Sequence, residues 1–210
     1  MRGVLAHDRL AWNRRHGFQR GPRVSALPAG GTVRAITRWG EPVMHKPCRE
    51  VTSFDAELRS LVADMVATMY AAEGVGLAAN QIGAGLKVFV FDCPDADGHH
   101  HTGVVCNPTV RVPVGRDRVL DDDEEGCLSL PGAFVACART DSAEVRGIDL
   151  HGRPTSYAGD GLLARCLQHE ADHLDGIVFA DRLSTRARKK LYKEAARLAV
   201  DFPPGWPTSR

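Results

Sequence analysis

The residues best suited to chemistry stand together in Gln168-His169-Glu170-Ala171-Asp172-His173. His169 and His173 are four positions apart, so on a helix both imidazoles lie on one face, roughly 6 Å apart at the backbone, and suit one metal ion. Glu170 follows the first histidine and projects at a different angle, so it reaches a water on the metal without binding the metal. This H-E-x-x-H pattern predicts metal-dependent hydrolysis. Two surface histidines on an amphipathic helix are the alternative interpretation.

A catalytic metal site needs a third protein ligand. One group of proteases places a histidine six residues after the second one, but here that position is Phe179, although Gly176 fits the pattern. Glu194 has the spacing of another group, which would make the chain a metallopeptidase, but an ion pair on a helix surface also explains it. No histidine follows His173, so we expect the third ligand upstream.

Cys127 is the upstream candidate, in Glu125-Gly126-Cys127-Leu128-Ser129-Leu130-Pro131. A thiolate is a good ligand for iron, zinc, nickel or cobalt. A cysteine can equally be a small buried hydrophobic residue, and the chain has 6 cysteines with no CxxC or CxxH pair among them. The first residues lack the apolar run of a secretory signal, so we expect reduced thiols and a cytoplasmic protein.

Three motifs, in this order, resemble those of the peptide deformylase family. They are Gly74-Val75-Gly76-Leu77-Ala78-Ala79-Asn80-Gln81, which matches G-x-G-x-A-A-x-Q, then Glu125-Gly126-Cys127-Leu128-Ser129, and then residues 168–174. The resemblance covers roughly residues 33–200. It implies an enzyme that removes the N-formyl group from the initiator methionine of nascent polypeptides and releases formate. It also implies a mixed α+β fold with a metal-binding helix packed against sheet.

The resemblance assigns the metal ligands and the catalytic groups. A divalent metal, Fe2+ first with Ni2+, Co2+ or Zn2+ as alternatives, would have as its ligands Cys127, His169 and His173. A water on that metal would attack the formyl carbon, with Glu170 as general base and then as general acid. The side-chain amide of Gln81 and the backbone N–H of Leu128 match the family's donors to the oxyanion.

The resemblance also implies that the edge formed by residues 74–76 pairs with the peptide backbone of the substrate. The expected substrate-binding residues are Gly74, Val75, Gly76, Leu162 and Cys166. Two positions depart from some relatives: Phe134 stands where they carry an arginine, and Arg165 replaces an aliphatic residue. We expect the stem of Arg165 to line the pocket and its head to lie in water.

Several other polar residues lie in or near these motifs. Glu125 and Asp172 match polar positions of the family and would orient ligands, and Arg139 is expected to pair with Glu125. The acidic run 121–125 is most simply a solvated loop edge. The histidines 99–101 are most simply a flexible hairpin loop, with adventitious metal binding as the alternative.

Residue patterns predict the elements that position these groups. Asp55 caps a helix that runs to about residue 72, with apolar residues at helical spacing. Residues 87–91, 104–106 and 143–150 predict strands, the second of which stops at Asn107-Pro108. Further helices are expected over 161–174 and, after Ser184, over 185–200. The fold class is α+β, with mixed or antiparallel sheets packed around a central metal-binding helix and a C-terminal helix.

Composition limits the remaining possibilities. The chain has 210 residues, 43% hydrophobic residues and a net charge of +1, which suits one globular domain and argues against a generally basic DNA-binding protein. No apolar run approaches the length of about 18 residues that spans a membrane. We expect a disordered N-terminal extension over 1–32, the catalytic domain over 33–200 and a C-terminal tail over 201–210. A transit segment or a nucleic-acid-binding arm is the alternative for 1–32.

The last predicted helix carries a cluster of cations against the single acid Glu194: Arg186, Arg188, Lys189, Lys190, Lys193 and Arg197. An ordinary solvated helix explains them, and so does an electrostatic surface that binds the ribosome near the tunnel exit, as in relatives that the chain resembles. A catalytically dead relative kept as a binding module remains a third class of function. The presence of Cys127, Gln81 and Glu170 argues against that class.

Overall fold

The computed structural model describes residues 27–207. Its three α-helices are α2 (Ala56–Ala71), α3 (Gly161–Leu174) and α4 (Thr185–Leu198). The main sheet is antiparallel throughout, in the order β1 (Gly76–Ala78), β2 (Val88–Pro94), β3 (His100–Arg111), β8 (Ser142–Ile148) and β9 (Pro154–Asp160). The predicted α+β class is therefore confirmed.

Two small antiparallel pairs form separate two-stranded sheets. β4 (Leu120–Asp121) pairs with β7 (Arg139–Thr140), and β5 (Glu124–Cys127) pairs with β6 (Leu130–Ala136). Short 3-10 helices follow or precede the larger elements: η1 (Pro42–His45), η2 (Ala79–Ile82), η3 (Gly115–Asp117), η4 (Phe179–Arg182) and η5 (Ala199–Asp201). No described helix is long and apolar enough to cross a membrane.

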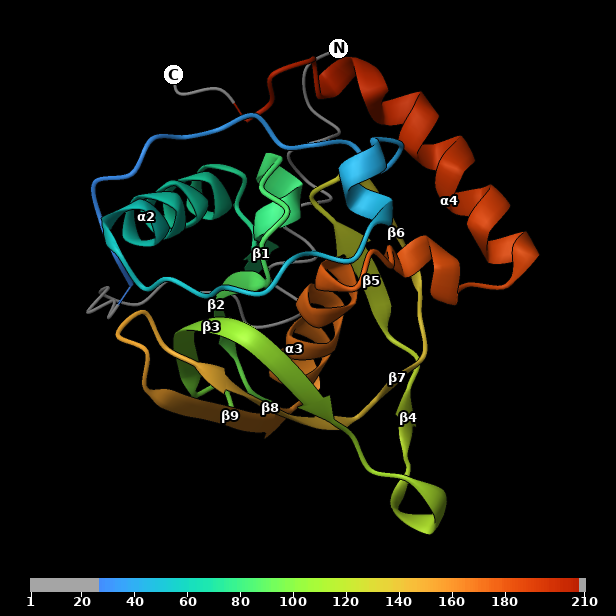
Figure 1. Ribbon diagram of the computed structural model, residues 1–210. Helices are drawn as coiled ribbons and strands as arrows, with labels where there is room; N and C mark the ends of the chain where they lie inside the picture. Colours follow the sequence, from blue (N-terminus) through green and yellow to red (C-terminus); the bar gives the residue numbers. More distant parts are fainter. Residues whose placement is uncertain (1–26, 208–210) are drawn as a thin grey trace.

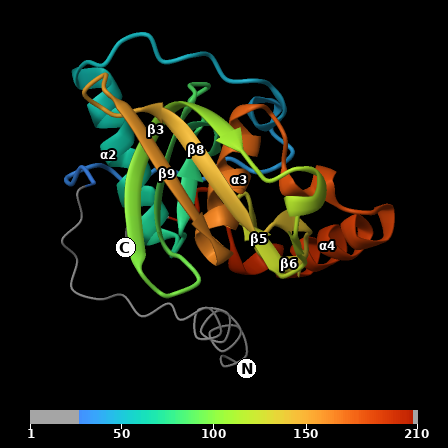
Figure 2. The same cartoon turned by 90° about the horizontal axis from the view of Figure 1, so that it is seen from below.

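The helix α3 lies at the centre of the molecule. Figure 1 shows strands β3, β8 and β9 of the main sheet below α3, the β5–β6 pair and α4 to one side, and α2 to the other. From below, strands β3, β8 and β9 cross in front of α3 (Figure 2). Because it is enclosed on several sides, every residue from Leu163 to Leu174 is buried except Gln168. Polar side chains on such a helix need partners inside the protein.

The helix α2 forms as its sequence predicts. The Asp55 carboxylate accepts hydrogen bonds from the backbone N–H groups of Glu57 at 3.0 Å and Leu58 at 3.1 Å, which confirms the expected cap. The apolar stripe packs against β1 and β2 in a core whose α2 members are Leu58, Val62, Met65, Val66 and Met69.

The expected end of a strand at Asn107-Pro108 is wrong. β3 continues to Arg111, and its register with β8 shifts between Cys106 and Thr109, which is a β-bulge. Asn107 adopts a φ of 49° there and bonds through its side chain to the backbone N–H of Val51 at 2.8 Å and to the carbonyl of Val51 at 2.9 Å. Asn107-Pro108 therefore lies at a bulge within β3 and does not end the strand.

The histidines 99–101 do not form a flexible loop as expected, because two of them belong to β3. The Nε2 atom of His101 lies 2.8 Å from Asp95 Oδ2, and the Nδ1 atom of His100 lies 3.2 Å from Asp92 Oδ1. These contacts hold both imidazoles against acidic side chains of the β2–β3 hairpin.

The folded part begins before residue 33. Leu27 is buried, the backbone N–H of Thr32 donates to Asp64 Oδ1 at 2.7 Å, and a Cβ atom at Gly31 would overlap the backbone of Ala63 in α2. Residues 27–32 are therefore packed, contrary to the expected extension over 1–32, and residues 1–26 lie outside the described part. The expected tail over 201–210 is likewise packed on the domain as far as Pro207, which is buried.

Candidate metal centre and active site

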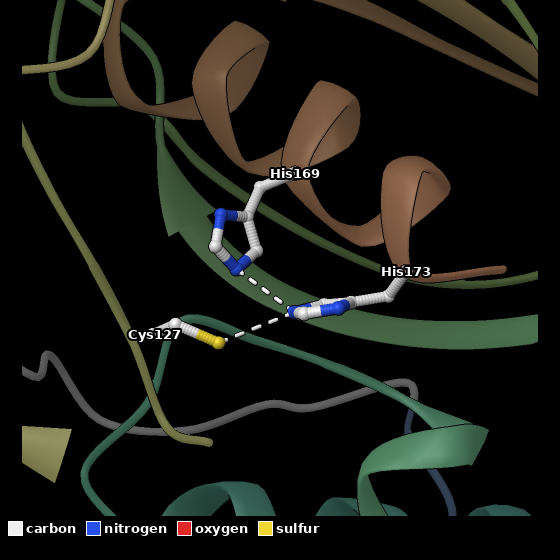
Figure 3. Close-up of side chains that lie close together, drawn as sticks. All are labelled: Cys127, His169 and His173. Atoms are coloured by element: carbon white, nitrogen blue, oxygen red, sulfur yellow. Dashed lines mark hydrogen bonds between the residues drawn. The ribbon is translucent and has the colours of Figure 1, made fainter. Parts of the chain in front are cut away.

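The strand β5 and the helix α3 bring three donor atoms together (Figure 3). Cys127 Sγ lies 3.2 Å from His173 Nε2, which lies 3.1 Å from His169 Nε2. The donor atoms of all three residues lie within 4.8 Å of one another, so they can share one ion at bonds of about 2.0–2.3 Å. The three predicted ligands therefore meet, although two come from a helix and one from a strand.

Both imidazoles direct their Nε2 atoms toward the other donor atoms. The Nδ1 atom of His169 lies 2.7 Å from Glu125 Oε1, so an Nδ1–H that donates to this carboxylate leaves Nε2 as the ligand atom. Burial lowers the pKa of His173 well below its ordinary value, which keeps that ring neutral. One thiol and two imidazole nitrogens are a donor set for iron, nickel, cobalt or zinc.

Glu170 lies beside this group on α3, buried against β1. A Cβ atom at Gly76 would lie 2.5 Å from Glu170 Oε1 and 2.8 Å from Cys166 Sγ, so only glycine allows the carboxylate to lie there. The other oxygen, Oε2, is buried without a hydrogen-bond partner in the described part of the chain. Burial raises the pKa of Glu170 to about 7, and the Glu125 carboxylate acts in the same direction. This carboxyl group can therefore both accept and release a proton near neutral pH.

The first motif is fixed to the metal-binding helix. The Asn80 side-chain amide donates to the carbonyl of His173 at 2.6 Å. Gln81 accepts from the backbone N–H of Ala78 at 2.8 Å through Oε1, which turns its Nε2 atom toward Cys127 Sγ at 3.6 Å. The amide donor of Gln81 thus faces the predicted metal ligands, and Leu128, directly after Cys127, lines the same cavity.

A buried charge network supports the histidines. Arg139 donates to both carboxylate oxygens of Glu125, at 3.0 and 2.7 Å, and to Asp172 Oδ2 at 2.6 Å. Despite its burial, the pKa of Glu125 stays below the ordinary value because of the neighbouring His169 ring and Arg139 guanidinium. The expected pairing of Arg139 with Glu125 is confirmed. The view of the acidic run 121–125 as a solvated loop edge is wrong for Glu125, which is buried in β5.

The head of Arg165 does not lie in water, contrary to our expectation. Its Nη1 donates to Glu125 Oε2 at 3.0 Å and to the carbonyl of Cys137 at 2.6 Å, and its Nη2 donates to the carbonyl of Asp121 at 3.0 Å. Its side chain is only 6% exposed. A buried guanidinium needs such partners, and they come from strands that no local sequence pattern connects to α3.

One cavity joins these groups to the predicted substrate-binding residues. Its walls include the expected Gly74, Val75, Gly76, Leu162 and Cys166, and also Gln81, Cys127, Leu128, His169 and Glu170. The departures Phe134 and Arg165 line it too. Sequence reasoning missed Trp206, which lies in the cavity wall far beyond the last motif. Glu194 pairs with Arg197 at 2.5 Å and is not part of the metal-binding group, so the metallopeptidase alternative gains no support.

Comparison with known proteins decides the family. The sequence model of the Polypeptide deformylase family matches residues 33–189. The chain belongs to the peptide deformylase family. Peptide deformylase 1 of Streptomyces avermitilis is 54% identical over 182 residues, which cover 86% of this chain and 84% of the relative. Peptide deformylase 2 of Streptomyces coelicolor is 49% identical over 176 residues, which cover 83% and 97%.

Solved peptide deformylases also share the fold. The crystal structure of the Legionella pneumophila enzyme has a TM-score of 0.70 and 37% identity, and the match covers 82% of this chain and 100% of that one. The Synechococcus elongatus peptide deformylase, solved in complex with actinonin, has a TM-score of 0.71 and 35% identity over 86% and 95%. The chain is therefore an enzyme of a metal-dependent family of hydrolases that serves protein biosynthesis, and its Cys/His/His group can bind the metal.

Proposed function

We propose that this peptide deformylase removes the N-formyl group from the initiator methionine of nascent polypeptides and releases formate. The observation that carries the proposal is one cavity lined by Cys127, His169 and the buried Glu170, where the donor atoms of Cys127 and His169 lie within 4.8 Å of that of His173. A metal group beside a carboxyl group whose pKa is near 7 suits hydrolysis of an amide at neutral pH.

The three ligand atoms would hold a divalent ion. A thiolate with two imidazoles favours Fe2+, Co2+, Ni2+ or Zn2+ over hard ions such as Mg2+ or Ca2+, and we propose Fe2+ as the native metal. When bound, such an ion polarises the formyl carbonyl and lowers the pKa of a water molecule. Glu125, through the Nδ1–H of His169, fixes the ring that presents Nε2 to the ion.

Different groups of the chain would transfer the proton and stabilise the developing negative charge. The Glu170 carboxylate accepts a proton from the attacking water and then donates it to the leaving amine of methionine. Its partnerless Oε2 supports this role. The Nε2 of Gln81 and the backbone N–H of Leu128 donate hydrogen bonds to the oxyanion that develops on the formyl oxygen.

The substrate would lie along the edge of β1. β1 is the first strand in the order of the main sheet, and the backbone N–H of Asp92 donates to the carbonyl of Val75 on the β2 side at 2.9 Å. On the cavity side, backbone groups of residues 74–76 would then form hydrogen bonds with an extended peptide. Leu162 and Cys166 would contact the methionine side chain.

The basic surface of α4 supports a proposal about the partner. Leu191 and Leu198 are buried, whereas Lys189, Lys190 and Lys193 are exposed on the outer side of the helix, which lies along the periphery of the molecule in Figure 1. We propose that this surface binds the ribosome near the tunnel exit in the cytoplasm, where formylated nascent chains emerge.

The test of the function is formate release. Protein loaded anaerobically with Fe2+, or with Ni2+ or Co2+ in air, should release formate from formyl-Met-Ala-Ser. Acetyl-Met-Ala-Ser is the matched control, because its extra methyl group changes only the acyl group. The Cys127→Ala variant should lose both metal and activity. Fully loaded wild-type protein that releases no formate would refute the proposal.

A further inference from the structure

The segment that follows α4 forms part of the cavity wall. The family match ends at residue 189, and the described part of the chain continues through η5 to Pro207. Trp206 lines the same cavity as Gly74, Leu128 and Glu170. A residue outside the family match is therefore placed beside the predicted substrate path.

Several interactions fix Trp206 in this wall. The backbone N–H of Ile36 donates to the Trp206 carbonyl at 2.9 Å, and the Trp206 N–H donates to the Pro203 carbonyl at 3.1 Å. The Arg38 guanidinium lies 5.8 Å from the centre of the indole ring and donates to the Phe202 carbonyl at 2.8 Å. The indole thus has a cation on one side and is tied to the first residues of the domain.

Phe202 supports the indole from a second direction. The two ring centres are 5.1 Å apart at 84°, an edge-to-face contact. Phe202 also approaches Gly132, where a Cβ atom would lie 2.8 Å from its ring, and Gly132 itself lines the cavity. Trp206 is half-buried and contributes to the surface of the cavity.

The surroundings of Gly76 and Gly74 indicate the direction in which a bound peptide would run. Gly76 adjoins Glu170 and Cys166, whereas a Cβ atom at Gly74 would lie 2.6 Å from Leu128 Cδ1. Leu128 and Trp206 both pack against the core on the α2 side, and Cys166 belongs to the core on the α3 side. A peptide with its formyl group at Glu170 therefore runs from Gly76 toward Gly74 and the wall of Leu128 and Trp206.

The spacing between Gly76 and Gly74 indicates which residue of the substrate lies near Trp206. An extended chain advances about 3.3 Å per residue, so the step from Gly76 to Gly74 spans roughly two residues of the bound peptide. We propose that Trp206 binds the side chain of the third residue of the substrate and favours an aromatic or large aliphatic side chain there. This inference rests on the proposed deformylation.

Kinetics with matched peptides test the inference. The Trp206→Ala variant of the full chain, loaded with metal, should show a KM for formyl-Met-Ala-Phe raised about ten-fold, as expected for loss of an aromatic pair with its buried area, and an unchanged kcat. Its KM for formyl-Met-Ala should not change. The Trp206→Phe variant should keep most of the affinity for formyl-Met-Ala-Phe, because it restores an aromatic face.

A binding measurement gives a readout besides turnover. The sequence has 3 tryptophans, so changing Trp12 and Trp39 to phenylalanine leaves Trp206 as the only tryptophan, whose emission is excited selectively over that of the tyrosines. The product peptide Met-Ala-Phe should change this emission, and Met-Ala should leave it unchanged. This variant keeps Trp206, so it also serves if the alanine variant fails to fold.

The outcomes separate the inference from the proposed function. The role of Trp206 would be overturned if Trp206→Ala changed the KM of both peptides equally or of neither. It would also be overturned if the Trp206 emission did not change on addition of Met-Ala-Phe. Loaded wild-type protein that deformylates neither peptide would instead refute deformylation, and the inference would fall with it.

Discussion

Arg165 on the metal-binding helix donates to Glu125 on the strand that carries Cys127, across 3.0 Å in the interior. The other oxygen of this carboxylate lies 2.7 Å from the Nδ1 atom of His169. The two segments that supply the three metal ligands are therefore joined through Glu125 as well as through the ion they would share. Arg165 adds bonds to the carbonyls of Asp121 and Cys137, which extend this connection to β4 and to the end of β6.

Replacing Arg165 with leucine should destabilise the metal-free protein. The change leaves the buried carbonyl of Cys137, the half-buried carbonyl of Asp121 and one oxygen of Glu125 without this donor. Breaking a buried ion pair costs about 3–5 kcal/mol. Urea unfolding gives the loss of free energy, and the rate of metal transfer to a chelator should rise as well. The matched control is Arg146→Leu, because Arg146 is 55% exposed in its pair with Glu144 and should matter little. Equal stabilities of the two variants would contradict the role of Arg165.

Replacing Glu170 with alanine or glutamine should preserve metal binding and abolish most turnover. General acid–base assistance is worth about 10²–10⁴-fold, and this carboxyl group would act in both directions. Metal content and formate release are measured on the same sample. A variant that turns over at nearly the wild-type rate would show that another group transfers the proton.

Replacing Cys127 with serine should change both the affinity for the metal and the choice of metal. A hydroxyl group is a harder and weaker ligand than a thiolate, so retention of iron, nickel or zinc after dialysis should fall. Cys48→Ala is the matched control, because Cys48 is also a buried free cysteine but lies outside the metal-binding group. Unaltered metal content in Cys127→Ser would exclude this residue as a ligand.

The sequence predicted the elements and residues that local rules define. The cap of α2 by Asp55, the bounds of α3 and the positions of His169 and His173 on one face follow from patterns within one or two helical turns. The motifs, through the family resemblance, also led to Cys127, Gln81 and the residues around Gly74. Each motif sits within one short stretch of chain, and the structure places residues from all three motifs at one cavity.

The features that sequence reasoning missed depend on contacts between distant segments. The inward turn of Arg165 depends on carbonyls about 28–44 residues away, and the place of Trp206 depends on Ile36 and Arg38 at the other end of the domain. The continuation of β3 past Asn107 depends on Val51, whose backbone binds the asparagine side chain. Neither spacing nor propensity encodes such partners.

Truncation at two positions tests where the folded part begins. Removing residues 1–26 should leave turnover unchanged, because no predicted site residue lies there. Removing residues 1–32 should lower the melting temperature, since it exposes the site of Leu27, whose burial is worth about 1.5–3 kcal/mol, and removes the bond from Thr32 to Asp64. Identical melting curves for the two truncations would show that residues 27–32 contribute nothing.

Charge reversal on α4 tests ribosome binding separately from catalysis. The Lys189/Lys190/Lys193→Glu variant should no longer sediment with ribosomes at low salt, because contacts to phosphates release counterions and dominate such binding. Wild-type sedimentation should weaken steeply as salt rises. Hydrolysis of formyl-Met-Ala-Ser should be unchanged, since these exposed lysines do not line the cavity. A matched control reverses exposed Arg49 and Arg59, which lie outside α4. Equal sedimentation of the α4 variant and wild type would leave α4 as a solvated helix that packs through Leu191 and Leu198.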